Sequence, residues 1–163
     1  MKTETEGKPE IGVLTKDREA VAGLLNRLLA DEFVLLTKTR NFHWNVTGIN
    51  FAPLHALFQK QYEELEGTVD ELAERVRALG HVPLGSLREF LEAARLRETP
   101  GKLLAPEKML AALLEDHESV IRNLRQDLEA CAARHRDAGT SDMLTGLMES
   151  HEKTAWMLRS HLG

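Results

Sequence analysis

Glycine and proline cluster at only a few places in this 163-residue chain, and long segments of helical period lie between the clusters. Within those segments apolar residues recur every three or four positions, which is the repeat of one face of an α-helix. Pro53 and Pro106 stand where a first helical turn accepts proline. The pattern therefore predicts long helices over residues 17–46, 53–79, 106–136 and 141–162.

The connection between the second and third predicted helices is too long for a simple turn. Ser86 followed by Glu89 has the spacing of a capping box, which predicts a short helix through about Arg95. Two short links and one long crossover then join the four long helices. We expect a short flexible tail over residues 1–15 and one all-α domain over 16–163, a four-helix bundle with a short extra helix in the crossover between helices 2 and 3.

Composition and charge exclude several classes of protein. With 21 basic and 26 acidic side chains the net charge is −5, which disfavours non-specific attraction to nucleic acid or anionic lipid. No segment has the run of about 18 apolar residues that a membrane helix needs, and the amino end lacks the apolar core of a leader peptide. The single cysteine, Cys131, cannot form an intrachain disulfide and is expected to be a small packing residue. We expect a cytoplasmic protein without membrane contact.

Metal-ligating side chains occur at intervals along the first two predicted helices. His43 precedes Trp44 in the run RNFHWNVTG, His55 follows twelve positions later, and Asp70 and Glu74 come further along. Imidazole nitrogen combined with carboxylate oxygen suits Fe(II), Mn(II) or Zn(II). No histidine has a glutamate three residues before it, so the Glu-x-x-His motif of di-iron bundles is missing. The remaining histidines, at positions 81, 117, 135, 151 and 161, are scattered at turns or on polar faces, so we expect them to be hydrogen-bonded structural residues rather than ligands.

One chain cannot bring all four side chains to one metal. His55 and Asp70 belong to one predicted helix, and fifteen residues of helix span roughly 22 Å. Two copies of that helix, crossing antiparallel about a two-fold axis near Glu64, would place position 55 opposite 74 and position 59 opposite 70. The spacing thus predicts a metal site shared between two chains across an isologous contact.

Five segments resemble the Dps family, the small ferritin-like proteins named for DNA protection in starved cells. They are NFHWNVTG, LHALF around His55, DELAERVRALG, SLREFLEAA and HEKTAWMLR, and the match that contains them extends over nearly the whole chain. The resemblance implies a ferritin-like bundle that assembles into a hollow homo-dodecamer. It also implies a ferroxidase that oxidises Fe(II), preferentially with hydrogen peroxide, and stores ferric mineral, which protects DNA under oxidative stress in a bacterial or archaeal cytosol.

The resemblance also assigns residues. It makes His43 and His55 iron ligands and catalytic residues from one subunit, and Asp70 and Glu74 those of its neighbour at the two-fold interface. Trp44 would lie near the oxidation site, where an indole can shield it, although a plain space-filling role between helices is the alternative.

Two further positions carry open alternatives. Gln59 offers a neutral amide oxygen, a weaker ligand, where the family usually has an acid, so whether one or two irons bind stays open. Asp142 matches an aspartate that lines a three-fold pore for cations in the family. An acid near a helix N-terminus can equally complement the helix dipole.

Two other functions compete with the ferroxidase. One is DNA binding and compaction, which in the family often uses a lysine-rich tail. Here Lys2 and Lys8 stand among three glutamates in the first ten residues, so we expect weak or absent DNA binding. The other is a metal-binding shell with weak ferroxidase activity, in which zinc competes with iron at His43 and His55.

Overall fold

The computed structural model describes residues 9–101 and 103–163, and within them the chain is all helical. The elements are α1 (Thr15–Asn45), α2 (Phe51–Ala78), α3 (Leu87–Ala93), α4 (Pro106–Glu129), the π-helix η1 (Ala130–Arg134) and α5 (Ala138–Leu162). The described residues contain no strand. This confirms the predicted four-helix bundle with an extra helix in the crossover. The first eight residues of the predicted tail lie outside the described part of the chain.

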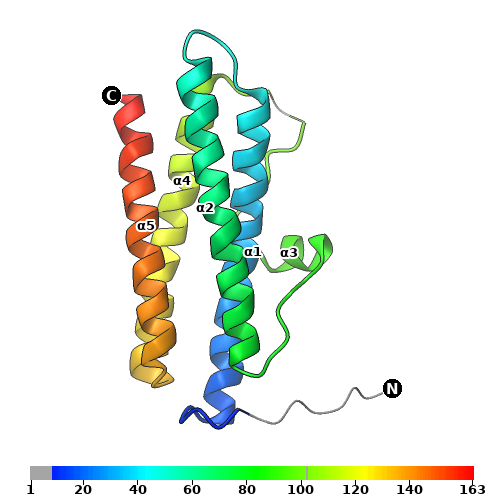
Figure 1. Ribbon diagram of the computed structural model, residues 1–163, viewed down its shortest axis with the longest axis vertical. Coiled ribbons are helices and arrows are strands. Elements are labelled where there is room, and N and C mark those ends of the chain that lie inside the picture. The colour runs from blue at the N-terminus through cyan, green and yellow to red at the C-terminus, as the bar shows by residue number, and fades with distance from the viewer. Residues whose placement is uncertain (1–8, 102) are drawn as a thin grey trace.

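The bundle is built from two antiparallel helix pairs, α1 with α2 and α4 with α5 (Figure 1). In the view of Figure 1, α1 and α5 run upward while α2 and α4 run downward. The crossover that contains α3 therefore carries the chain from one end of the bundle back to the other. It passes along the outer side of α1, where α3 packs.

The crossover is attached to α1 by one buried carboxylate. Asp31 accepts hydrogen bonds from the backbone amides of Arg95 and Leu96, at 2.5 and 3.1 Å. The Arg95 side chain closes the contact by donating from Nε to Asp31 at 2.7 Å. Nearby, the rings of Phe33 and Phe90 stack with centroids 4.0 Å apart. These contacts hold α3 against the bundle.

The helix ends agree with the sequence signals at two places. Pro106 opens α4 in its first turn. Ser86 caps α3, since its hydroxyl accepts from the Glu89 amide while the Glu89 carboxylate accepts from the Ser86 amide at 3.0 Å. The capping box predicted from the spacing of these two residues is thus confirmed.

The turn between α4 and α5 differs from the sequence expectation. Regular α-helix stops at Glu129, one π-helical turn follows, and Arg136 then takes the left-handed conformation with φ at 53°. The last helix begins at Ala138, three residues before the predicted start. The reason is Asp137, whose side chain accepts from the Thr140 amide at 3.0 Å and so caps α5.

Cys131 lies in the π-helical turn and is fully buried. Burial, with smaller contributions from Asp137 and Asp127, raises the pKa of its thiol to about 12. The thiol is therefore protonated at neutral pH and serves as a packing group, as expected from sequence. Among the described residues, no helix is long and apolar enough to span a bilayer.

Candidate metal centre

His43 and His55 lie side by side at one end of the first helix pair. His43 is in the last turn of α1, His55 is in the first turns of α2, and the short link between the helices folds one back on the other. The two imidazole rings stack with centroids 3.7 Å apart and planes inclined by 21°. The structure thus brings together the two histidines that the sequence singled out.

Each of these histidines is held by the backbone of the other. Nδ1 of His43 donates to the carbonyl oxygen of His55, and Nδ1 of His55 donates to the carbonyl oxygen of His43, both at 2.8 Å. A carbonyl can only accept, so the proton of each neutral ring is on Nδ1. Both Nε2 atoms therefore keep a lone pair free for a metal, which is the outer-shell arrangement of histidine ligands.

Aromatic and charged neighbours fix the rings further. Phe51 stacks on His55 with centroids 4.9 Å apart, and the rings of Tyr62 and His43 make a T-shaped contact with centroids 5.2 Å apart. The guanidinium carbon of Arg40 lies 4.7 Å from the centre of the Tyr62 ring, and Arg40 also pairs with Glu66. The sequence analysis missed Tyr62 and Arg40. Their spacing was the available signal, because Tyr62 lies two turns after His55 and Arg40 one turn before His43.

Asp70 and Glu74 lie one turn apart on α2, and both are exposed. Within the described residues neither side chain has a hydrogen bond or an ion pair, and no three His, Cys, Asp or Glu side chains converge on one point. The two carboxylates are far along α2 from His55. A single chain thus leaves the four predicted ligands divided, and their meeting across a two-fold axis stays a prediction.

Gln59 is oriented by its neighbour one turn along α2. Its side-chain nitrogen donates to the Glu63 carboxylate at 2.8 Å. Since a carboxylate only accepts, this bond assigns the amide nitrogen to the side of Glu63 and leaves the amide oxygen facing away from it. Gln59 can therefore present an oxygen to a cation.

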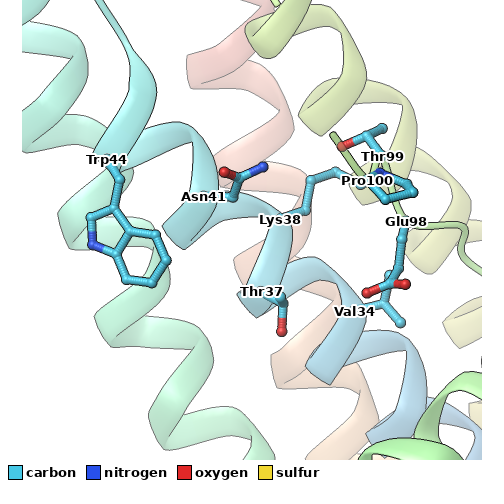
Figure 2. A pocket seen from close by; sticks show the side chains of 8 residues that line it. All are labelled: Val34, Thr37, Lys38, Asn41, Trp44, Glu98, Thr99 and Pro100. Carbon is cyan, nitrogen blue, oxygen red and sulfur yellow. The ribbon is translucent and has the colours of Figure 1, made fainter. Parts of the chain in front are cut away.

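Trp44 does not fill space inside the bundle, because 68% of its surface is exposed in the single chain. It borders a cavity of about 260 Å³, with α1 residues on one side and the crossover residues Glu98, Thr99 and Pro100 on the other (Figure 2). The cavity contains neither His43 nor His55. The space-filling alternative for Trp44 within one chain is therefore wrong.

Asp142 lies exposed in the second turn of α5. The first turn of that helix contains no acid, and its N-terminus is capped by Asp137. The alternative that Asp142 complements the helix terminus is weakened by this arrangement, while the pore role involves several chains and stays a prediction.

For His117 and His151 the expected hydrogen-bonded role is confirmed, but their expected place at turns or on polar faces is wrong. Both are buried between the helices, and their Nδ1 atoms are 2.8 Å apart. A signal was present, since each falls on the apolar stripe of its helix. His117 follows Leu113 by four positions, and His151 follows Leu144 by seven.

Comparison with known proteins agrees with this architecture. A family model described as the ferritin-like domain matches residues 22–163, which places the chain in the ferritin-like class of helical bundles. The crystal structure of the Dps protein from Vibrio cholerae O1 superposes with a TM-score of 0.90 at 32% identity, covering 99% of this chain and 100% of that one. That protein is described as a member of the ferritin-like diiron-carboxylate superfamily.

Proteins of similar sequence show which family within the ferritin-like class the chain belongs to. DNA protection during starvation protein 2 of Bacillus anthracis is 39% identical over 142 residues, which is 87% of this chain and 96% of the relative. The low temperature-induced protein all0458 of Nostoc is 47% identical over 152 residues, 93% of this chain and 85% of the relative. The chain belongs to the Dps family.

Proposed function

We propose that this protein is a ferroxidase and iron store that oxidises Fe(II), preferentially with hydrogen peroxide, at sites shared between two copies of the chain. The observation that carries the proposal is the reciprocal hydrogen bonding of His43 and His55, which leaves two neighbouring Nε2 lone pairs pointing away from the backbone. Membership of the Dps family supports it independently. Iron is the substrate here rather than a resident cofactor.

The side chains divide the chemistry between them. His43 and His55 bind Fe(II) as neutral nitrogen ligands, which suit that oxidation state. Asp70 and Glu74 of a second copy complete the site with anionic oxygens, which stabilise the added charge of Fe(III). Neither carboxylate has a hydrogen bond or ion pair among the residues that the structure describes, which leaves both exposed to a second chain. Gln59 contributes its amide oxygen as a weaker, neutral ligand.

The redox balance favours peroxide as oxidant. Each Fe(II) loses one electron, and hydrogen peroxide takes two electrons and two protons as its O–O bond breaks to give two waters. Two irons oxidised together therefore consume one peroxide without releasing a hydroxyl radical. Ferric ions then hydrolyse and form mineral inside a hollow dodecamer in the cytoplasm, with cations passing pores lined by Asp142.

A double substitution tests the site. Peroxide is titrated into protein loaded anaerobically with Fe(II), and we expect two irons oxidised per peroxide in the wild type. The double variant H43A/D70A should lose this activity, because each metal site then lacks one ligand from each of the two chains. The matched control H161A with E71A removes an exposed imidazole and a neighbouring α2 carboxylate. Full activity in H43A/D70A would refute the assignment.

Three measurements test the assembly and separate the competing functions. Native mass spectrometry should give about 220 kDa for twelve chains of 18.3 kDa. Elemental measurement of the purified shell tests whether zinc occupies the histidine pair and slows iron oxidation. A gel shift with supercoiled plasmid tests DNA compaction, for which we expect no shift at physiological salt. A complete shift at low protein excess would make DNA binding the main activity.

A further inference from the structure

A second group of polar side chains lies in the middle of the bundle, away from the histidine pair at its end. Each of the four long helices contributes one member: Glu32 from α1, Gln61 from α2, His117 from α4 and His151 from α5. All four are at least 96% buried. The surrounding residues form the apolar core of the bundle.

These side chains leave an unusual number of buried atoms without a hydrogen bond. Within the described part of the chain, both oxygens of Glu32, both polar atoms of Gln61 and Nε2 of His117 have none. Buried polar atoms are nearly always hydrogen-bonded, and each exception calls for a physical explanation. A buried carboxylate is the most costly of these groups, because its charge is removed from water.

Glu32 and His151 lie at hydrogen-bond distance from each other but are not aligned for a hydrogen bond. Oε1 of Glu32 lies 3.0 Å from Nε2 of His151, yet the direction does not satisfy an N–H to oxygen bond. Nitrogen and oxygen ligands about 2 Å from one tetrahedral ion are roughly 3.3 Å apart. A small shift would thus admit a cation between these atoms.

No lysine or arginine neutralises Glu32 among the described residues. Lys38, the buried lysine of the same helix, is bound to Asp116 at 2.6 Å, and His151 is the one ion-pairing partner of Glu32. A divalent cation would supply the missing charge. It would also give the orphaned carboxylate oxygens a partner.

His117 orients His151 for this role. If Nε2 of His151 binds a cation, its Nδ1 carries the proton and donates to Nδ1 of His117 at 2.8 Å. A metal-bound histidine commonly donates its second N–H in this way.

The group is reached along the seam between α2 and α5. A cavity of about 20 Å³ is lined by Gln61, His117 and His151, together with Ser150 and Thr154. That space suffices for one water-sized species. A larger cavity of about 80 Å³ shares Gln61, Ser150 and Thr154 with it and extends to Lys60 and Lys153, which are exposed. The two cavities mark a path inward from the surface.

We propose that the centre of each bundle is a second metal site, which binds one divalent first-row transition ion through Glu32 and His151. Gln61 supplies a further oxygen directly or through a water, and His117 is the positioning residue. Carboxylate and imidazole donors select ions such as Zn²⁺, Co²⁺ or Fe²⁺ over Ca²⁺. Only two charged or imidazole ligands take part, which agrees with the absence of a three-residue cluster among the described side chains.

Cobalt binding tests the proposal independently of ferroxidase activity. The H43A/D70A shell, in which the interface site is disabled, is stripped with a chelator and dialysed against Co²⁺. We expect one Co²⁺ per chain with visible d–d absorption. Adding E32Q should weaken binding at least ten-fold, whereas E19Q, an exposed glutamate of the same helix, should leave it unchanged. A Co²⁺ affinity that E32Q does not alter would overturn the proposal.

Crystallography tests the position without relying on the E32Q variant. Wild-type crystals soaked in Co²⁺ and measured at the cobalt edge should show an anomalous peak between Glu32 and His151, separate from any peak at His43 and His55. Peaks at the interface alone would overturn the bundle site while leaving the proposed ferroxidase intact. The reverse pattern would retain the bundle site and refute the interface site.

Discussion

The molecule contains two histidine pairs that are built in opposite ways. His43 and His55 are tied through Nδ1 to backbone carbonyls and keep both Nε2 atoms free. His117 and His151 bond to each other through Nδ1, and His151 faces a buried carboxylate. The backbone-tied pair is fixed before any metal arrives. The core pair is held by side chains alone, so we expect its arrangement to be less firmly fixed.

The largest expected difference between the pairs is in catalysis. We expect H55A to slow peroxide-driven Fe(II) oxidation by at least about 100-fold, since loss of an outer-shell partner of a metal ligand already costs about 10–100-fold. H151Q should stay within about two-fold of wild type. Stopped-flow absorbance of ferric product at equal protein concentration measures both. Equal losses in the two variants would show that the pairs act as one site.

The second expected difference is in the free energy of unfolding, which should increase when the core group is replaced. Replacing the core group with apolar residues, as in E32M with H117L and H151L, removes orphaned polar atoms from the core. We expect the chelator-stripped variant to be more stable by about 1–4 kcal/mol, as when buried polar networks are replaced by apolar side chains. Denaturant unfolding followed by circular dichroism measures this, with H43A as the comparison. A destabilised triple variant would mean that the core group contributes to folding.

The core pair should also make stability depend on pH. Because the pKa of His117 is lowered in the fold, the unfolded chain binds more protons below its ordinary value of 6.5. Stability of the stripped protein should therefore fall as pH decreases from about 6.5, by about 1.4 kcal/mol per pH unit while His117 stays neutral. In H117L this slope should be reduced. An unchanged slope would assign the dependence to other groups.

The smallest expected effect concerns the ring that supports His43. Y62L removes the aromatic ring whose centroid is 5.2 Å from that of His43, and we expect it to weaken Zn²⁺ binding at the interface about ten-fold. Y62F keeps the ring and should bind as the wild type does. Calorimetric titration of stripped shells compares the three proteins. If Y62F also loses ten-fold, the Tyr62 hydroxyl rather than its ring supports the site.

The helices and their order followed from periodicity because apolar spacing reports directly which face of a helix is buried. The end of α4 could not be predicted from periodicity. The π-helical turn and the Arg136 conformation depend on how Asp137 caps the next helix. The core histidines were missed for a related reason. A histidine on an apolar stripe gives no sign of its partner, and the partners of His117 and His151 come from distant parts of the chain.

The residues of the candidate site could be predicted from the sequence, but the hydrogen bonds that hold them in place could not. The proximity of His43 and His55 follows from two helices joined by a short link. The exchange of hydrogen bonds with backbone carbonyls needs three-dimensional positions that no spacing rule provides. The pairing of Gln59 with Glu63 is similar, because several helical neighbours one turn apart could have formed it.

The buried thiol of Cys131 has a consequence for the proposed reaction with peroxide. Peroxide attacks the thiolate, and a thiol whose pKa is about 12 yields almost none at neutral pH. The chain's single cysteine is therefore protected from sulfenic acid formation during turnover. Repeated exposure to the oxidant should therefore leave the protein free of disulfide cross-links between chains.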